Sequence, residues 1–228
     1  MADSANRGSQ KWLQIAVNQK PELLLHALRE SGAIGQETTV TWQSPLKGDP
    51  SRPFKEYRDG EALEKAGIKQ LKVPLHSFWP RRGPVWDAIG VTSDGPLFIE
   101  AKAHIPEAAS PATKASSLAS RKLIYKSLVK TRHFYAPKAT AVWGRVFYQY
   151  SNRLAYQYFL KQLNDVPSAL VFLYFLNDVD MGGPASKEEW QGASHLIHAV
   201  LGIRRDLNLT SHKVFNAFLD IRLLRDVM

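Results

Sequence analysis

Residues 85–104 read VWDAIGVTSDGPLFIEAKAH, and this stretch decides the fold that we expect for the chain. Two apolar runs flank the Ser-Asp-Gly sequence of residues 93–95, a pattern that predicts a β-hairpin. The first strand of this hairpin carries Asp87, and the second carries Glu100 and Lys102. These three charges either decorate a solvated face or belong to one site, and the geometry of the hairpin bears on that choice.

Pairing across the hairpin places the three charged side chains. Side chains alternate across a strand, so Glu100 and Lys102 share one face. The dipeptide Asp94–Gly95 favours a two-residue turn, which makes the numbers of paired residues add up to 189. Asp87 then lies opposite Lys102 and diagonal to Glu100, on the same face. A three-residue loop would instead turn Asp87 to the other face.

Two carboxylates beside a lysine suit one kind of chemistry well. Mg²⁺ prefers one or two carboxylates together with waters and phosphate oxygens, and it lowers the pKa of a bound water. A neighbouring lysine can orient that water or stabilise developing negative charge. The alternative is an ordinary cross-strand pair between Asp87 and Lys102 on a solvated face, with Glu100 unrelated to it.

The rest of the chain predicts a single α/β domain over residues 1–228, with residues 1–10 disordered. Apolar periodicity, β-branched runs and Pro or Gly boundaries predict the elements. We expect helices over residues 20–32, 54–68, 116–135, 143–163 and 184–202, and strands over residues 37–46, 68–79 and 168–178 besides the hairpin. Residues 213–221 could form a strand or a helix, and we favour the strand. The continuous apolar run within residues 168–178 is typical of a strand buried on both faces. This order predicts a central mixed β-sheet flanked by helices on both faces.

The composition limits the classes of function. The chain has 228 residues, 30 Lys and Arg against 21 Asp and Glu, a net charge of +9 and no cysteine. The absence of cysteine excludes disulfides and cysteine-ligated metal sites. No run of apolar residues approaches the ~20 that a membrane-spanning helix needs, and the amino-terminal residues show no secretory signal, so we expect a cytoplasmic protein. The basic balance favours a polyanionic partner such as nucleic acid.

Asp87, twelve intervening residues and then Glu100-Ala-Lys102 at the end of an apolar strand resemble the PD-(D/E)XK nuclease superfamily, the restriction-endonuclease-like fold. In that family the first acidic residue lies in one hairpin strand, the (D/E)-x-K element ends the next, and a helix and another buried strand follow. The resemblance covers a nuclease core of about residues 56–178. It departs from the family pattern in having Trp86 before the aspartate, with the proline at Pro84.

The resemblance implies roles for further residues. Asp87 and Glu100 would hold Mg²⁺ or Mn²⁺, and Lys102 would be the catalytic lysine. Members often carry another glutamate on a preceding helix, for which Glu64 is the first candidate and Glu61 or Glu56 weaker ones. For each of the three taken singly, a solvated helix charge is the favoured interpretation. A polar or basic residue after the lysine strand is often used as well. The candidates for that position are Lys114, Ser117 and Arg121.

Apart from the resemblance, Arg81 and Arg82 directly precede the strand that carries Asp87 and could hold a phosphate of the backbone. Lys122, Lys126 and Lys130 recur every four residues and either contact flanking phosphates or form a solvated helix face.

Several other side chains allow two interpretations. Trp79 and Trp86 could stack on unpaired bases or pack in the core. His195 and His198 could bind a metal, although no third ligand is in view, or could be ordinary helix residues. His104 could lie at the rim of the site. No phosphate-binding loop, nucleophile elbow or zinc-protease motif occurs, which removes the corresponding enzyme classes.

The sequence therefore predicts a metal-dependent endonuclease that hydrolyses phosphodiester bonds, with DNA favoured over RNA and a homodimer possible. The alternative is a catalytically silent member of the same fold that binds nucleic acid or a protein. A third interpretation is a basic α/β protein that acts on a small molecule and has no salt-dependent affinity for DNA.

Overall fold

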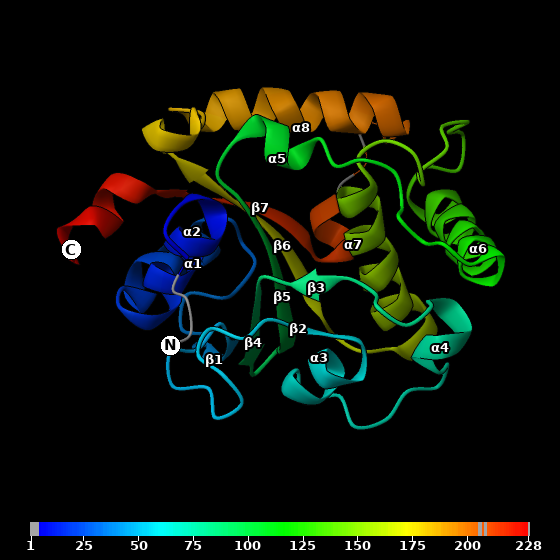
Figure 1. Cartoon of the computed structure of the whole chain (residues 1–228), viewed down its shortest axis with the longest axis horizontal. Helices are drawn as coiled ribbons and strands as arrows, with labels where there is room; N and C mark the ends of the chain where they lie inside the picture. The colour runs from blue at the N-terminus through cyan, green and yellow to red at the C-terminus, as the bar shows by residue number, and fades with distance from the viewer. Residues whose placement is uncertain (1–4, 205–206, 208, 228) are drawn as a thin grey trace.

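A five-stranded mixed sheet forms the centre of the computed structural model, which describes residues 5–204, 207 and 209–227 (Figure 1). The strands lie in the order β1 (Thr41–Ser44), β4 (Ala88–Thr92), β5 (Gly95–Lys102), β6 (Ala169–Leu176) and β7 (Val214–Asp220). A separate two-stranded ribbon pairs β2 (Tyr57–Arg58) with β3 (Val85–Trp86). The expected α/β class with a central mixed sheet is confirmed.

The strands run in two senses. β1, β4 and β5 form an antiparallel meander, whereas β6 is parallel to β5 and β7 is parallel to β6. The crossover from β5 to β6 contains α5 (Ile105–Ala108), α6 (Leu118–Tyr135), α7 (Tyr148–Tyr158) and a π-helical turn (Phe159–Leu163), and the crossover to β7 contains α8 (Lys187–Leu201). Short 3₁₀ helices cover Val179–Met181, Leu209–His212 and Ile221–Val227. Parallel neighbours need such long connections because the chain must return to the starting edge.

Helices cover both faces of the sheet, as expected. On one face, α1 (Gly8–Asn18) and α2 (Pro21–Glu30) pack against residues such as Ile99 and Val171. On the other face, α6, α7 and α8, with α3 (Asp59–Lys65) and α4 (Leu75–Phe78), pack around residues such as Phe98 and Phe172. Strand alternation divides β5 and β6 between these two cores, so each central strand is apolar on both sides. The expectation for the apolar run of residues 168–178 is therefore confirmed.

Two segments depart from the sequence prediction at the amino-terminal end. α1 begins at Gly8, inside the range expected to be disordered, and Ser9 and Trp12 are buried. Residues 1–4 lie outside the described part of the chain. The helix is stabilised by packing rather than by propensity, because the Trp12 indole N–H donates a 2.7 Å hydrogen bond to the buried carboxylate of Asp178. A partner so distant in sequence leaves no local signal.

The expected strand over residues 68–79 was wrong. Most of that segment has no regular structure, and α4 occupies its end. Pro74 directly precedes α4, where its fixed φ and missing N–H oppose a strand and suit a helix start. The expected helix over residues 54–68 is reduced to β2 followed by α3. The other expected elements occur, with shifted ends.

The β4–β5 hairpin has a different register from the predicted one. Thr92 pairs with Gly95, so the turn residues are Ser93 and Asp94 and the numbers of paired residues add up to 187 instead of 189. Gly95 has a φ of 117°, a conformation that residues with a Cβ rarely adopt. The two-unit change in the sum shifts each pairing along the strand but preserves which face each residue occupies.

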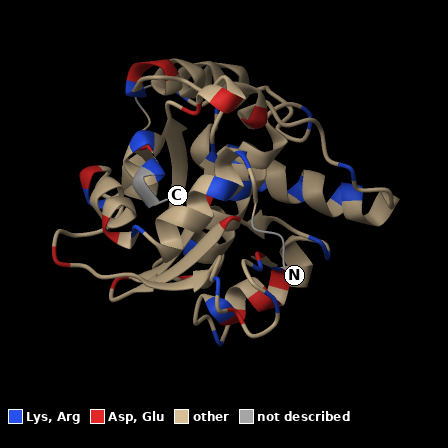
Figure 2. Cartoon of the chain, turned by 60° about the vertical axis from the view of Figure 1, so that its left-hand side comes forward, with Lys and Arg blue, Asp and Glu red and all other residues tan. Residues whose placement is uncertain are grey.

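Two further observations concern the surface. No helix in the described ranges combines the length and apolarity needed to cross a membrane. Basic and acidic positions lie interspersed on the side of the molecule that Figure 2 turns forward, so the charge of +9 is not confined to one element.

The close approach at Gly95 generates a test of the hairpin. A Cβ at this position would lie 2.2 Å from the Pro167 carbonyl oxygen, and the positive φ adds strain. We expect Gly95→Ala to lower the free energy of unfolding by about 2 kcal/mol or more in urea denaturation. Gly192→Ala is the control, because that glycine lies within α8 with open space around it, and it should stabilise by about 1 kcal/mol. Equal effects of the two substitutions would contradict this account.

Candidate functional site

A cleft of about 1060 Å³ opens where the carboxyl end of β5 faces α7 and the segment before α6. Asp87, Glu100 and Lys102 all line it, so the structure brings together the three residues that the sequence singled out. Glu100 and Lys102 occupy alternate positions at the end of β5, and Asp87 lies between β3 and β4. Asp87 was expected within the first hairpin strand opposite Lys102, but it lies directly before β4, and its carboxylate bonds to the backbone of Ala101, between Glu100 and Lys102.

Asp87 is held by the neighbouring strand. Its Oδ2 accepts a 2.7 Å hydrogen bond from the backbone N–H of Ala101, and among the described residues no donor is bonded to its Oδ1. Burial and then the negative charge of Glu100 raise the pKa of Asp87 well above its ordinary value. The protonated form is thereby favoured, and a cation placed beside Oδ1 would oppose this shift.

Both carboxylate oxygens of Glu100, a residue only 2% exposed, are paired with cations. The Lys102 ammonium donates to Oε1 at 2.6 Å, and the Arg153 guanidinium donates to Oε2 through Nε at 2.5 Å and also through Nη2. Burial alone would raise the pKa of Glu100, but Arg153 and then Lys102 hold it below its ordinary value. Glu100 is therefore ionised and fully compensated in this arrangement.

Arg153 is fixed by contacts on every side of its guanidinium. Nη1 donates to the Asn152 side-chain oxygen at 2.9 Å, and Nη2 donates to the Val85 carbonyl at 2.7 Å. The guanidinium carbon lies 4.7 Å from the centre of the Trp86 ring. Such a position joins α7 to β3 and β5 through one buried side chain, and the planar guanidinium suits it better than an ammonium would.

Lys102 is a charged donor rather than a proton acceptor. Burial alone would lower its pKa, but the charges of Glu100, Asp87 and Glu107 outweigh burial and raise the pKa above its ordinary value. The ammonium therefore stays protonated at neutral pH. It can orient a water or stabilise negative charge, and it cannot serve as a general base.

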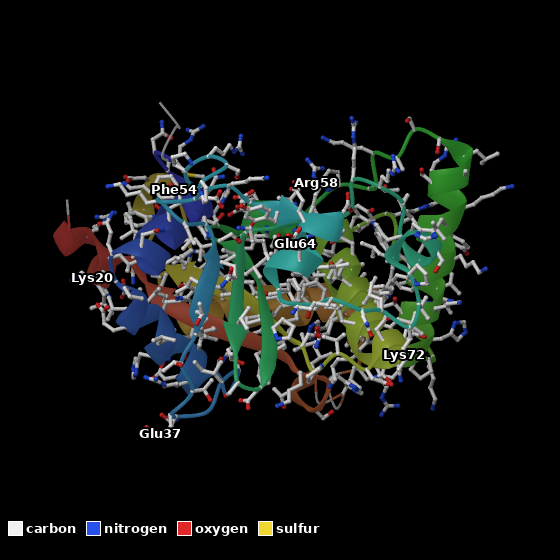
Figure 3. All side chains as sticks on the ribbon, turned by 90° about the horizontal axis from the view of Figure 1, so that it is seen from below. Lys20, Glu37, Phe54, Arg58, Glu64 and Lys72 are labelled. Atoms are coloured by element: carbon white, nitrogen blue, oxygen red, sulfur yellow. The ribbon has the colours of Figure 1, made fainter. Side chains whose placement is uncertain are left out.

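The additional acidic residue is placed differently from the first expectation. Glu64 lies on the exposed side of α3 and does not line the cleft (Figure 3). Glu56, a weaker candidate, does line it, and burial and then the charge of Glu100 raise its pKa. One Glu56 oxygen accepts a 2.9 Å hydrogen bond from the Gln10 amide. Glu61 is exposed and pairs with Lys55 at 3.3 Å.

Three of the seven basic residues proposed for contact with the nucleic-acid backbone line the cleft. Arg81, Arg82 and Lys114 are exposed at its edge and form no ion pair with any described residue. The loop that carries the two arginines is shaped by Asp59, whose carboxylate accepts hydrogen bonds from the backbone N–H groups of Arg82 and Gly83, both at 2.9 Å. The other four, Arg121, Lys122, Lys126 and Lys130, are exposed on α6 and do not line the cleft, whereas Ser117 does.

The tryptophans and histidines follow the simpler of their two interpretations. Trp79 and Trp86 are 5% and 1% exposed, so they pack in the core instead of offering a free ring face. His198 forms a 2.7 Å hydrogen bond with the Tyr150 hydroxyl, and burial and then His195 lower its pKa to about 4. His104 lies 3.4 Å from Glu107 and is not part of the cleft lining. In the described ranges, no three or more His, Asp or Glu side chains form a ready metal site.

Sequence reasoning missed Arg153 and its neighbour Asn152. Both belong to α7, a helix whose residues 150–157 are all buried. An arginine inside a wholly buried helix needs an acidic partner, because an unpaired buried charge is very costly. That requirement was the available signal, but the aromatic residues on every side of the helix hid which face was buried.

The Arg153–Glu100 pair should be important for stability. We expect Arg153→Leu to lower the free energy of unfolding by about 3–5 kcal/mol, because it leaves Glu100 buried with only one cation. The double variant Arg153→Leu/Glu100→Gln should recover a large part of the loss. As a control, Lys72→Ala removes an exposed ion pair with Asp165 and should cost less than about 1 kcal/mol. Urea denaturation measures all three, and a loss below about 1 kcal/mol for Arg153→Leu would refute the assigned role.

The raised pKa of Asp87 predicts a pH dependence of stability. The folded chain binds the proton of Asp87 more tightly than the unfolded chain does. The contribution of Asp87 to the free energy of unfolding is therefore lost as the pH rises from about 4 through the raised pKa. Asp87→Asn keeps an acceptor for Ala101 and removes the charge. We expect Asp87→Asn to raise the melting temperature at pH 7–8, by about 2–4 °C for each ~1 kcal/mol gained in the free energy of unfolding. This gain should decrease as the pH falls toward 4.

Asp94→Asn, in the exposed hairpin turn, provides the matched control and should leave the pH profile unchanged. A melting temperature of Asp87→Asn that falls below that of the native chain at pH 7–8 would contradict the prediction.

Comparison of the chain with protein-family models, curated proteins and solved structures gives no match in any of the three. The chemistry of the cleft is therefore the basis for the function proposed next.

Proposed function

We propose that the chain is a metal-dependent nuclease of the PD-(D/E)XK type that hydrolyses phosphodiester bonds, with DNA as its first expected substrate. The observation that carries the proposal is the meeting of Asp87, Glu100 and Lys102 at the carboxyl end of β5 in one cleft. The order of elements supports it, since the lysine strand is followed by helices and then by a buried parallel strand, as the resemblance requires.

In this proposal a hard divalent cation binds at Asp87, although the Asp, Glu and His side chains of the described residues form no ready group of three ligands. Asp87 and Glu56 face the charge of Glu100, and this repulsion contributes to the raised pKa of each. Mg²⁺ or Mn²⁺ would be held by Asp87 with Glu56, and by Glu100 if this residue exchanges its contact with Lys102 or Arg153 for the metal. When bound, such an ion lowers the pKa of a water and stabilises phosphoryl charge.

The residues of the chain have separate tasks in this proposal. Arg81, Arg82 and Lys114 attract the sugar-phosphate backbone to the cleft. The protonated Lys102 then lies where it can orient the attacking water and stabilise charge on the phosphate oxygens. Arg153 holds Glu100 in position and is already satisfied by protein groups, so we assign it a positioning role.

A second candidate is a catalytically silent protein of the same fold that binds nucleic acid. The full pairing of Glu100 with two cations favours it, because a metal would need to displace one of these contacts. The two candidates differ in turnover: the silent protein would retard DNA in a gel without cutting it.

The test is cleavage of plasmid and single-stranded DNA with Mn²⁺ or Mg²⁺. We expect the native chain to cleave, and Lys102→Ala to cleave about 100-fold or more slowly, because a charge donor to the transition state is lost. Lys20→Ala is the control, since Lys20 follows α1 on the far side of the sheet, and its rate should be unchanged (Figure 3). A melting curve for each variant distinguishes lost chemistry from lost folding.

Equal rates for the native chain and Lys102→Ala would remove Lys102 from the mechanism. Retardation without cleavage, with either metal and with every DNA form, would favour the silent binder.

A further inference from the structure

Helix α6 has a charge distribution unlike that of the chain as a whole. Its 18 residues, LASRKLIYKSLVKTRHFY, include no Asp or Glu. Its basic residues other than histidine are Arg121, Lys122, Lys126, Lys130 and Arg132. An α-helix of this length extends about 27 Å, so its exposed basic residues Arg121, Lys122, Lys126 and Lys130 form a long positively charged surface without compensating acids on the same element. Arg132 is half-buried and donates to the Ala141 carbonyl.

An aromatic residue stands within this basic surface. Tyr125 is 59% exposed, and Leu118, seven residues earlier on the same side of α6, is 60% exposed. Arg121 and Lys122 precede Tyr125 by four and three residues, which makes them its neighbours on the helix surface. Tyr125 therefore offers an exposed ring with two basic residues one helical turn earlier, whereas Trp79 and Trp86 are enclosed in the core.

The exposed face of α6 continues from the cleft. Ser117 and Ser120, at the amino-terminal end of the helix, line the cleft, and the exposed residues begin with Leu118. In both Figure 1 and Figure 3, α6 lies at the edge of the molecule, with no other element over its outer side. A polymer that enters the cleft can thus extend along α6.

Another exposed apolar pair shows why charge matters here. Leu196 and Val200 on α8 are 61% and 43% exposed, but α8 carries Glu188 and Glu189 in its first turn and offers no comparable set of cations. Isolated exposed apolar residues are common and need no ligand. Charge complementarity to phosphate is the feature that distinguishes Tyr125 and its surroundings.

We propose that the exposed face of α6 binds a nucleic-acid strand with unpaired bases, with Arg121 and Lys122 on its phosphates and Tyr125 stacked on a base. This inference rests on the nuclease proposal for the cleft and names its substrate class as single-stranded nucleic acid. Stacking requires a free base face, which a duplex covers with its neighbouring pairs, while phosphate contacts are open to both forms. Tyr125 should thus act on single strands and the two cations on both forms.

The experiment measures binding of a labelled 20-nucleotide single-stranded DNA and of the same sequence as a duplex by fluorescence anisotropy. EDTA is present throughout, so that cleavage plays no part. We expect Tyr125→Ala to weaken binding of the single strand roughly 5- to 100-fold and binding of the duplex less than twofold. Tyr125→Phe, which keeps the ring, should bind as the native chain does.

Two further variants separate stacking from charge. Lys122→Ala should weaken binding of both forms and reduce the salt dependence of each by about one unit of slope. Leu196→Ala on α8 should change neither. Equal losses for single strand and duplex in Tyr125→Ala, an unchanged affinity in that variant, or no binding of either DNA by the native chain would each overturn the inference.

These outcomes are independent of the cleavage test. A native chain that binds single strands through Tyr125 but cuts nothing would keep this inference and refute the nuclease proposal. A chain whose cleavage activity depends on Lys102, but whose single-strand affinity is unchanged in Tyr125→Ala, would support the nuclease proposal and refute this inference.

Discussion

The structure around the cleft depends on the buried pairing of Glu100 with Arg153 and Lys102. A carboxylate that is 2% exposed would be very costly without compensation, so these two cations are a condition for placing Glu100 inside the protein. Because Arg153 also bonds to Val85 and lies over Trp86, the same pairing fixes α7 against β3 and β5. The pairing of Arg153 with Glu100 thus helps to position α7 and β3, two elements that line the cleft.

The sequence predicted the fold class and the proximity of the three charged residues. Neither prediction required the exact position of the hairpin turn to be correct. The predicted turn was displaced, yet a change of two in the sum of paired numbers leaves each residue of β4 on its expected face, and Asp87 directly precedes β4. Alternation along β5 and the buried apolar character of β6 are local properties of the chain, and local properties can be read from the sequence. An error of one in that sum would have separated the charges.

The parts that could not be predicted depend on partners distant in the sequence. Arg153 is 53 residues from Glu100, and the hydrogen bond from Trp12 to Asp178 spans 166 residues. The helix around Arg153 indicates that an acidic partner is needed, but the local sequence around Arg153 or Trp12 does not indicate which residue that partner is. Glu56 was ranked below Glu64 because helical position was used as the guide, whereas the tertiary packing of β2 against β3 brings the segment next to Glu56 toward the cleft.

The charges of the cleft are arranged in two zones, and this division limits how a polyanion could bind. At the floor, Lys102 and Arg153 compensate Glu100, and the acidic residues Asp87 and Glu56 also line the cleft. At the edge, Arg81, Arg82 and Lys114 have no acidic partner in the described ranges, and a phosphate would be attracted to them first. A phosphate reaching the floor would meet the Asp87 carboxylate unless a cation or a proton neutralised it. The residues at the edge therefore attract a nucleic-acid strand, and different residues at the floor control whether its phosphate enters. Only entry to the floor depends on the ionisation of Asp87.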